Sequence, residues 1–511
     1  MDSAHLEILT ADQMRQAEDQ AARELPGGTF TLMENAGQAV FDFLLTRHAE
    51  AHGFDVLCGP GNNGGDGYVV ARLLREAGLD VRLFALAAPR EGTDAARAAS
   101  GWSGSVEDLA TWQPEEGRLI VDAIFGAGLS RNLEGLVLDV VREARTAAST
   151  VVAVDLPTGI EADTGAVLED AFKASATISF CRAKPAHLML PGRAHCGDVI
   201  IRDIGIDPRH IEGLKPKMKL NAPTLWANDF PWPGETDHKY TRGHVGVFGG
   251  GAMTTGAARL SAMAAARIGA GAVTVLSPAN ALLLYAMNLT SIMVARYEIE
   301  QELDDFLTRR HPQAFVLGPG FGAPGKARAI VRRLSEADEA VRPKAIVLDA
   351  DGLTAFEERP EELFEIAAEY RGQGGQLVMS PHMGEYKRLF SEVEGGPVEL
   401  ARQAAARAQC VLLLKGADTV IADPEGNVVI NSSAPAWLAT AGSGDVLAGM
   451  IGGLLAQGMP ALGAASAACQ LHAQCAAVHG PGLMAEDIPG LLPSVLRDLW
   501  REGRDHLQTE R

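Results

Sequence analysis

Cysteine is scarce in this sequence, and none of it is arranged in closely spaced pairs. The 511 residues include six cysteines without CxxC spacing, several of them inside apolar runs: Cys58, Cys181, Cys196, Cys410, Cys469 and Cys475. Disulfide frameworks and cysteine-based zinc sites depend on dense or regularly spaced cysteines, so the pattern disfavours both. We predict buried free thiols, which fit a reducing compartment.

Positive charge and long apolar runs are also lacking. The chain has 65 Asp and Glu residues against 45 Lys and Arg, which gives a net charge of -20. This charge disfavours nucleic acid as a partner, so an anionic ligand has to be held by local amides and a few placed cations. No apolar stretch is long and glycine-free enough to cross a bilayer, and the first residues are polar and acidic, unlike a secretory signal. We expect a cytoplasmic protein with no membrane or nucleic-acid partner.

The chain is too long for one hydrophobic core, which predicts more than one domain. Strand-like apolar runs alternate with helical patterns from residue 54 to about Ile206, and again from His244 onwards. This alternation predicts mainly parallel sheets that are covered on both faces. Residues 207–237 are rich in proline and lack a regular pattern. We predict domains at residues 1–213 and 237–511, with a linker and the start of the second domain at residues 214–236.

A glycine-rich stretch, FDVLCGPGNNGGDGYVVARLLREAG, occupies residues 54–78. Residues 54–58 are typical of a buried strand and residues 68–77 have apolar side chains at helical spacing, so we expect a strand-to-helix loop between them. Glycines let backbone amides approach a ligand, and the helix directs its positive end to the same point. The pattern predicts an anion site. The alternative is a simple tight turn, which does not explain Asn62, Asn63 and Asp66 together.

Two further strand ends carry polar residues. Asp122 ends one apolar strand, before a glycine loop that contains Ser130, and Asp155 ends the next, just before Thr158. Parallel strands bring such residues to one rim of a sheet. A carboxylate, an amide oxygen and a hydroxyl are ligands for a hard cation, and Asp155 is placed to accept a proton from a ligand. The alternative for each aspartate alone is a helix cap or a loop fastening.

A second candidate site lies in ATAGSGDVLAGMIGG, residues 439–453. We predict that residues 441–444 form a loop whose amides point at phosphate oxygens, and that Asp445 opens a helix over residues 446–455. A carboxylate at a helix N-terminus is stabilised as an anion and can accept a proton from an alcohol or from water. A helix cap alone would explain the aspartate but not the Gly-Ser-Gly run before it.

Over about the first two hundred residues, the motifs LMENAG, GPGNNGGDGYVVAR, VDAIFGAGLSR, VDLPTG and AKPAH resemble the epimerase domain of the NAD(P)H-hydrate repair enzymes. The resemblance implies a Rossmann-like three-layer α/β sandwich that interconverts the R and S epimers of hydrated NADH and NADPH with a bound potassium ion. It implies that Asn63, Asp122 and Thr158 hold the potassium, with threonine where many relatives have serine, and that Asp155 contacts the reacting ring. Lys184 is a weaker candidate for this site. The hydrate-binding residues that it implies are Asn62, Asn63, Gly64, Gly65, Asp66, Gly126, Ala127, Gly128, Leu129, Ser130, Arg131 and Asn132.

From His238 onwards, the motifs HKYTRGHVGVFGGG, GPGFG, LDADGL, SPHMGE, KGADT and ATAGSGDVLAGMIGGLLAQG resemble the ADP-dependent NAD(P)H-hydrate dehydratase domain, which has a ribokinase-like three-layer α/β fold. The resemblance implies that Ala257, Gly320, His382 and Asp445 lie near the hydrate, with Asp445 as the catalytic residue. His382 has the alternative role of a hydrogen-bonded loop histidine. The nucleotide-binding residues that it implies are Lys415, Gly416, Ala417, Asp418, Thr419, Ala441, Gly442, Ser443 and Gly444.

The resemblance implies a two-step repair enzyme. One domain equilibrates the epimers, and the other uses ADP to dehydrate the S form to NAD(P)H, giving AMP and phosphate. Magnesium is expected with the nucleotide, because phosphoryl transfer needs its charge neutralised. The expected partners are the dinucleotide substrate, ADP and further copies of the chain. One alternative is a ribokinase-type small-molecule kinase with a non-catalytic N-terminal domain. Another is an N-terminal scaffolding module, which would be expected to have lost at least one of Asn63, Asp122, Asp155 and Thr158.

Overall fold

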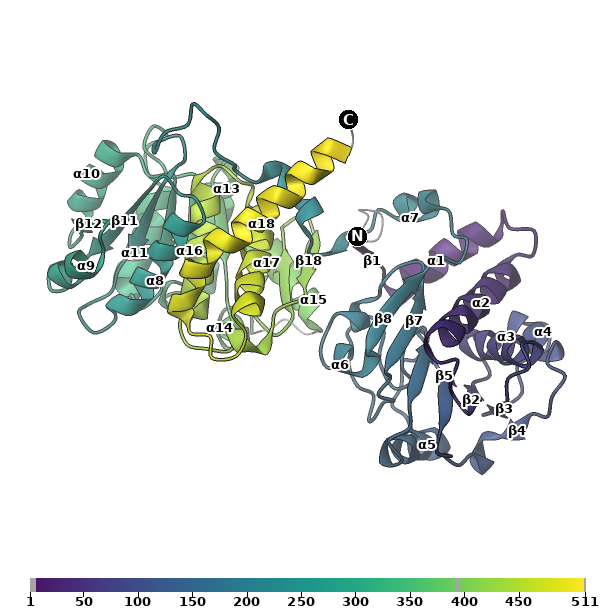
Figure 1. Cartoon of the computed structure of the whole chain (residues 1–511). Coiled ribbons are helices and arrows are strands. Elements are labelled where there is room, and N and C mark those ends of the chain that lie inside the picture. Colours follow the sequence, from purple (N-terminus) through teal and green to yellow (C-terminus); the bar gives the residue numbers. More distant parts are fainter. Residues whose placement is uncertain (1–5, 392–394, 510–511) are drawn as a thin grey trace. The chain divides into compact units, whose positions relative to one another are not determined.

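The computed structural model describes residues 6–391 and 395–509. The chain divides into two compact units, Met1–Lys219 and Leu220–Arg511 (Figure 1). Each unit is an α/β domain with a mainly parallel sheet and a hydrophobic core of its own. The predicted fold class, two α/β domains in one chain, is confirmed.

The first unit is built on a seven-stranded sheet in the order β4-β3-β2-β5-β6-β7-β8. All neighbouring strands of this sheet run parallel, as the sequence pattern predicts. Its strands are β2 (Gly53–Cys58), β3 (Val81–Ala85), β4 (Glu107–Asp108), β5 (Arg118–Ala123), β6 (Val151–Val154), β7 (Ala176–Phe180) and β8 (Asp198–Arg202). A short strand β1 (Glu7–Ile8) pairs antiparallel with β9 (Met218–Leu220) through Glu7↔Lys219 and Ile8↔Met218.

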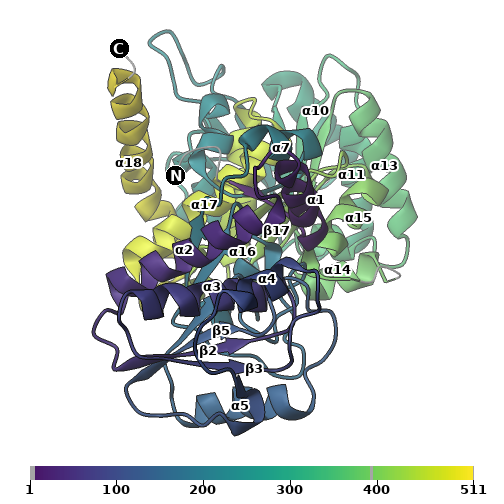
Figure 2. The same cartoon turned by 90° about the vertical axis from the view of Figure 1, so that its right-hand side faces the viewer.

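Helices cover both faces of this sheet. Figure 2 shows α1 to α4 on one face and α5 on the other. The helices are α1 (Ala11–Ala22), α2 (Thr29–Arg47), α3 (Asn62–Glu76), α4 (Asp94–Ser100), α5 (Gly135–Thr146), α6 (Arg193–Cys196) and α7 (Pro208–Leu214). Successive side chains of a strand point to opposite faces. In β2, Val56 therefore lies in the core shared with α2 and α3, and Leu57 lies in the core shared with α5.

The glycine-rich stretch after β2 is mostly helix, which corrects the predicted loop. Helix α3 begins at Asn62, so residues 59–61 alone form the turn and residues 62–66 occupy the first turns of the helix. Close packing explains the glycines. A Cβ atom at Gly64 would lie 1.8 Å from the carbonyl oxygen of Gly59, and one at Gly67 would lie 2.7 Å from the Cβ of Ala123. The glycines thus let a helix start directly against the strand ends.

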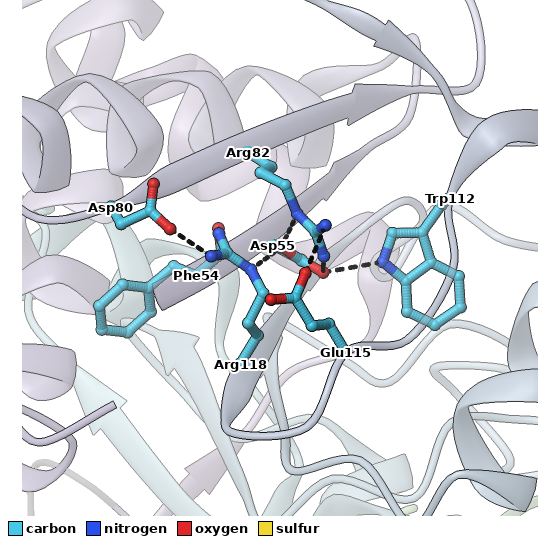
Figure 3. Close-up of polar contacts among 7 residues, drawn as sticks. All are labelled: Phe54, Asp55, Asp80, Arg82, Trp112, Glu115 and Arg118. Atoms are coloured by element: carbon cyan, nitrogen blue, oxygen red, sulfur yellow. Dashed lines mark hydrogen bonds and ion pairs between the residues drawn. The ribbon is translucent and has the colours of Figure 1, made fainter. Parts of the chain in front are cut away.

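A buried carboxylate joins three neighbouring strands of this sheet, β3, β2 and β5. Asp55 of β2 is 1% exposed. Its Oδ1 accepts hydrogen bonds from Arg82 Nε of β3 at 2.8 Å and from Arg118 Nε of β5 at 2.7 Å, as Figure 3 shows. Its Oδ2 accepts from Arg82 Nη2 at 2.6 Å and from Trp112 Nε1 at 3.1 Å. Arg82 also contacts the exposed Glu115 at 2.8 Å. The network pins the register of β2, β3 and β5.

The second unit contains a sheet in the order β18-β17-β16-β15-β14-β13-β10-β11-β12. Neighbours from β12 to β16 are parallel, whereas β17 pairs antiparallel with both β16 and β18. The strands are β10 (His244–Phe248), β11 (Ala272–Ser277), β12 (Met293–Arg296), β13 (Ala314–Leu317), β14 (Ala345–Leu348), β15 (Gln376–Met379), β16 (Val411–Leu414), β17 (Thr419–Ala422) and β18 (Val428–Asn431).

Helices also cover both faces of this second sheet. In Figures 1 and 2, α8, α16, α17 and α18 lie on one face, and α11, α13 and α15 lie on the other. The longer helices are α8 (Thr255–Arg267), α10 (Glu300–Arg310), α11 (Pro324–Ser335), α13 (Pro360–Gly372), α15 (Pro397–Ala408), α16 (Ser443–Ala456), α17 (Ala461–His479) and α18 (Ile488–Thr509). The shorter ones are α9 (Leu282–Asn288), α12 (Asp351–Thr354) and α14 (Met383–Leu389).

Helix α16 lies unusually close to α8, and glycine makes this possible. A Cβ atom at Gly449 would lie 2.1 Å from the carbonyl oxygen of Ser261, and one at Gly453 would lie 2.3 Å from Ile268 Cγ2. On the sheet side, a Cβ atom at Gly452 would lie 2.5 Å from Val316 Cγ2. The glycines of α16 are therefore packing residues, because any side chain at these positions would collide with α8 or the sheet.

The segment 214–236, predicted as a linker and the start of the second domain, lies across the division between the units and is folded. It contains β9 and two 3-10 turns, η4 (Pro223–Leu225) and η5 (Ala227–Asp229). Trp226 is 1% exposed within the core of the second unit, and its Nε1 donates to Asn221 Oδ1 at 3.2 Å. Burial of this indole holds the segment against the second unit.

All six cysteines are buried free thiols, as predicted. Within the part of the chain that the structure describes, no helix is long and apolar enough to cross a membrane.

Candidate active sites

A cavity of about 710 Å³ lies at the carboxyl ends of β2, β5, β6 and β7 in the first unit. From β2 the sheet order runs to β3 on one side and to β5 on the other, and open α/β sheets bind ligands beside such a switch point. The cavity lining includes residues 60–63 and 124–130, which follow β2 and β5. It also includes Asp155 and Lys184, which follow β6 and β7. The three strand ends identified in the sequence thus meet at one rim.

Asp155 is held by several donors at the end of β6. Its Oδ1 accepts from Lys184 Nζ at 2.7 Å and from Ser179 Oγ at 3.0 Å, and its Oδ2 accepts from the amide of Ala127 at 3.0 Å. The backbone φ angle of Asp155 is 66°, in the left-handed region that residues other than glycine rarely adopt. Burial alone would raise the pKa of Asp155, but the charge and hydrogen bond of Lys184 outweigh it and lower that pKa. Asp155 is therefore ionised at neutral pH and fixed in the cavity wall.

His187 forms hydrogen bonds with the backbone of both Asp155 and Lys184. Its Nδ1 accepts from the amide of Lys184 at 3.0 Å, so its Nε2 carries the proton and donates to the carbonyl oxygen of Asp155 at 2.9 Å. Burial, and then the charge of Lys184, lower the pKa of His187 to about 4. The ring is therefore neutral, and it sets the backbone of both partners.

Asp122 and Thr158 form a buried polar cluster beneath the cavity. Thr158 donates from its amide to Asp122 Oδ2 and from its hydroxyl to Asp122 Oδ1, both at 2.7 Å. Burial raises the pKa of Asp122 to about 6, and its hydrogen bonds with Thr158 only partly offset this. Asn63 lies on the Asp155 side of the cavity, because a Cβ atom at Gly126 would lie 2.9 Å from both Asn63 Oδ1 and Asp155 Oδ2. Asn63 Nδ2 is buried without a hydrogen-bond partner among the described residues.

This donor set fits a hard monovalent cation. The carboxylate of Asp122 and the hydroxyl of Thr158 are in contact, and the pKa of this buried carboxylate is raised although it accepts hydrogen bonds. A cation there would favour its ionised form. Among the described residues, no group of three or more His, Cys, Asp or Glu side chains has a metal-binding arrangement, whereas the proposed ligands here include an amide and a hydroxyl.

Part of the cavity wall comes from α1, which the sequence analysis missed. Ala11, Met14, Arg15 and Glu18 line the cavity at helical spacing. Burial is the main cause that raises the pKa of Glu18 to about 7, with Lys184 opposing it and Asp155 adding to it. Burial also raises the pKa of Asp66 well above its usual value. The helical spacing alone could have identified this face of α1, but no motif marked it.

Some of the predicted hydrate-binding residues lie outside this cavity lining. Gly64 and Gly65 pack within the fold, and a Cβ atom at Gly65 would lie 2.6 Å from Met33 Cε. Arg131 and Asn132 are exposed beyond the end of the lining. The predicted residues that line the cavity are Asn62, Asn63, Asp66, Gly126, Ala127, Gly128, Leu129, Ser130 and Asp155.

In the second unit, Asp445 lies in the first turn of α16. The helix begins at Ser443, two residues before Asp445, which corrects the predicted start at residue 446. Gly442 has a φ of 89° and adopts the left-handed conformation at the N-cap, so the chain enters the helix through a turn that favours glycine. Burial, and then the charge of Asp349, raise the pKa of Asp445 to about 6, while Lys415 opposes them.

Lys415 links this helix start to the carboxyl ends of two strands. It follows β16, and its Nζ forms an ion pair with Asp349, which follows β14 and is 1% exposed. A Cβ atom at Gly444 would lie 3.4 Å from Lys415 Nζ and 3.7 Å from Asp349 Oδ2. Asp349 was not singled out in the sequence, although it lies within the quoted LDADGL motif.

His382 caps a short helix. Its Nδ1 accepts from the amide of Gly384 at 2.9 Å, and Glu385 Oε2 accepts from the amide of His382 at 2.9 Å, which is a reciprocal cap of α14. The side chain of His382 is 58% exposed, and its backbone forms a bridge with Lys415. The Nδ1 atom of His382 is thus used for a local hydrogen bond, as in the predicted alternative of a hydrogen-bonded loop histidine. The backbone of His382 still lies beside that of Lys415, the lysine of the candidate site.

The remaining predicted residues fall into two groups. A Cβ atom at Gly320 would lie 3.1 Å from Ala257 Cβ, so these two are neighbours beyond β10 and β13. In the KGADT segment, Gly416 and Ala417 are exposed, whereas Asp418 and Thr419 are buried, and Thr419 Oγ donates to the carbonyl oxygen of Gly416 at 3.2 Å. Ala441 is exposed before the helix start.

Comparisons with protein families cover both units. The family model of NAD(P)H-hydrate dehydratase matches residues 245–487, and the model of the YjeF-related protein N-terminus matches residues 29–186.

Similar proteins share the whole length. The chain is 34% identical to the bifunctional NAD(P)H-hydrate repair enzyme Nnr of Moorella thermoacetica, over 97% of each chain. It is 31% identical to the enzyme of the same name from Escherichia coli, over 95% of this chain and 93% of that one. Among solved structures, it resembles the ADP/ATP-dependent NAD(P)H-hydrate dehydratase from Bacillus subtilis with 27% identity and a TM-score of 0.44, over 53% of this chain and 94% of that one.

Proposed function

This chain belongs to the family of bifunctional NAD(P)H-hydrate repair enzymes, and we propose that its two units divide the repair between them. The cavity at Asp155 interconverts the R and S epimers of the hydrate, and the site at Asp445 dehydrates the S epimer to NADH or NADPH. The observation that carries this division is that each unit presents its own acidic side chains and a lysine at the carboxyl ends of its own parallel sheet. We assign epimerisation to residues 1–213 and dehydration to residues 237–511.

In the first site, Asp155 is ionised and held in place before any ligand arrives. It is placed to accept the proton of the hydroxyl group on the reacting carbon of the hydrate. The turn at residues 59–61 and the start of α3 offer backbone amides and a helix dipole to the pyrophosphate. Residues 62–66 and 126–132 are the proposed hydrate-binding segments, through those of their side chains that line the cavity.

Asn63, Asp122 and Thr158 are the proposed ligands of a potassium ion. When bound, this ion supplies a fixed positive charge that neutralises Asp122 and ties the ends of β2, β5 and β6 together. The support is the contact of the Thr158 hydroxyl with the buried Asp122 carboxylate, whose pKa burial raises to about 6. The consequence is a rim that holds the nicotinamide ring beside Asp155.

In the second site, the start of α16 acts on phosphate. The backbone at residues 441–444 and the positive end of the helix hold the transferred phosphoryl group, and Lys415 adds a positive charge beside Gly444. Asp445 accepts the proton of the hydrate hydroxyl as that oxygen attacks the phosphorus atom. Hydroxide is a poor leaving group and phosphate is a good one, so phosphorylation prepares the elimination that regenerates NAD(P)H.

ADP is the proposed phosphoryl donor, giving AMP and phosphate. Magnesium supplies charge neutralisation on its phosphates when bound. The KGADT segment, residues 415–419, is the proposed nucleotide-binding segment, and Ala257, Gly320 and His382 are proposed to face the hydrate. We further propose a cytoplasmic homo-oligomer with no nucleic-acid or membrane partner. The net charge of -20 supports the lack of a nucleic-acid partner.

The test is recovery of nicotinamide absorbance from a mixture of both hydrate epimers with the full chain, ADP and magnesium. The wild-type chain is expected to convert both epimers. Asp445→Asn is expected to abolish dehydration of the S epimer while R-to-S conversion continues, and Asp498→Asn, an exposed change in α18, serves as the matched control. A stable phosphorylated product without reduced nicotinamide would instead establish a small-molecule kinase. Near-normal dehydration by Asp445→Asn would refute the assigned role.

A further inference from the structure

Glu18 belongs to α1 and lines the cavity. It comes from neither a strand end nor the glycine-rich motif, and burial raises its pKa to about 7. It lies outside residues 29–186, which the matching N-terminal family model covers. Met14 and Ala17 on the same helix are buried in the core, which holds α1 against the unit. Arg15 and Glu18 lie one turn apart and both line the cavity. The helix therefore presents Glu18 to the ligand space from a fixed scaffold.

Two carboxyls that line the cavity, Asp155 and Glu18, have surroundings that shift their pKa values in opposite directions. Asp155 has Lys184 at 2.7 Å and two further donors, which keep it ionised. Burial keeps the pKa of Glu18 near 7, and the charge of Asp155 contributes in the same direction. Two acids whose surroundings push their pKa values apart are the usual sign of one proton acceptor and one proton donor.

The epimerisation requires such a pair. The reacting carbon of the hydrate bears a hydroxyl and is bonded to the ring nitrogen, so its configuration inverts when the ring opens to an aldehyde and closes again on the other face. Opening removes a proton from the hydroxyl oxygen and adds one to the ring nitrogen. A site with a single proton acceptor would leave the departing nitrogen negatively charged.

We propose that Glu18 is the proton donor of this epimerisation, acting with Asp155 as the acceptor; this rests on the proposed function of the first unit. Asp155 takes the hydroxyl proton, and the O–H electron pair becomes the second carbon–oxygen bond. The carbon–nitrogen pair moves to the ring nitrogen, which takes the proton of Glu18. After rotation about the adjacent carbon–carbon bond, both transfers run in reverse, so the two carboxyls return to their starting states and no other reactant is consumed.

Asp66 is the competing donor in the same cavity, and its surroundings suit it less well. Burial raises its pKa well above the usual value, with Asp155 and Glu18 adding to the effect, and this shift toward the protonated form disfavours release of the proton. An efficient donor that must also take the proton back has a pKa near the working pH. The other charged groups around Glu18 are Asp12, Arg15 and Asp19 of α1, Glu161 and Asp163 after β6, and Lys184.

The experiment measures R-to-S conversion by the full chain against pH, with the uncatalysed rate subtracted, for the wild type, Glu18→Gln, Glu18→Asp and Asp19→Asn. Asp19 is the exposed acidic neighbour on the same helix and does not line the cavity. The wild-type rate is expected to fall as the pH rises through about 7, where Glu18 loses its proton. Glu18→Gln should lower kcat by on the order of 10²-fold or more and abolish this fall, with little change in KM.

Hydrogen exchange of peptides from β2 and β5 reports that the first unit of each variant is folded, because this unit has a core of its own. Dehydration of the pure S epimer by the second unit should stay unchanged. Glu18→Asp should keep a reduced rate with an alkaline fall, which a purely structural role would not produce. Asp19→Asn should keep a rate near that of the wild type, with the alkaline fall moved slightly to lower pH because the charge of Asp19 helps to raise the pKa of Glu18. The proposal is overturned if Glu18→Gln keeps a rate near that of the wild type, if it keeps the alkaline fall, or if Asp19→Asn loses as much. A wild-type chain that does not accelerate R-to-S conversion would instead refute the function proposed for the first unit.

Discussion

Replacing Asp55 by asparagine tests whether the buried network in Figure 3 stabilises the first unit. The change keeps the side-chain volume but removes the negative charge between Arg82 and Arg118. Asp55 accepts four hydrogen bonds, at 2.8, 2.7, 2.6 and 3.1 Å. Asparagine turns an NH2 group toward at least one of these donors. The Arg118 side chain is 6% exposed, so water cannot readily replace the lost carboxylate.

The magnitude follows from this burial. Removing one partner of a buried ion pair costs about 3–5 kcal/mol, and asparagine retains one accepting oxygen, so we expect the lower end of this range, about 3 kcal/mol. This corresponds to roughly a hundredfold increase in the open population. The matched control is Glu115→Gln. The Glu115 side chain is 59% exposed, and its ion pair with Arg82 should contribute about 0–1 kcal/mol.

Hydrogen exchange of the full chain, followed by mass spectrometry on peptides from β2 and β5, measures the effect in the first unit alone. Urea-induced loss of epimerase activity gives a second measure. Protection in β2 and β5 should fall in Asp55→Asn and stay near the wild-type level in Glu115→Gln, while peptides of the second unit should not change in either. Equal protection in the two variants would show that the network fixes strand register without adding stability.

Two other predictions concern the sites. Asp122→Ala should lower R-to-S conversion by about 10–100-fold, the usual range for disturbing a metal site, and leave dehydration of the pure S epimer intact. For this variant, R-to-S conversion should no longer differ between assays in potassium and assays in a large organic cation. Unchanged conversion would rule out the proposed cation site. Dehydration of the S epimer should fall as the pH drops through about 6, because Asp445 accepts a proton only when ionised and its pKa is raised to about 6; kcat/KM measured against pH would contradict this if it stayed level across that range.

The sequence predicts the strand-end residues well because their placement follows from topology. A parallel sheet delivers every strand end to one rim, so Asp122, Asp155 and Thr158 converge once the βαβ rhythm is recognised. The same reasoning places Lys415 near the start of α16. None of this requires knowledge of side-chain packing.

Residues that reach a site by packing could not be predicted in this way. Glu18 lines the cavity because the adjoining side of α1, with Ala17 and Ala21, is buried in the core, which is a long-range contact with no local motif. The start of α3 was misplaced because glycine normally disfavours helices, whereas here Gly64 is required where the helix approaches the carbonyl oxygen of Gly59. Tertiary packing overrode the local preference in both cases.

The contact between α16 and α8 has a consequence for how the second site responds to its ligands. Gly449 and Gly453 bring α16 against α8 so closely that the helix cannot shift without collision. We therefore expect its first turn, which carries Asp445, to keep the same geometry with and without nucleotide. The conformational entropy of this first turn is lost during folding, so ligand binding does not have to order the segment again. Any closure over the substrates has to come from movement of the surrounding loops toward α16, which stays in place.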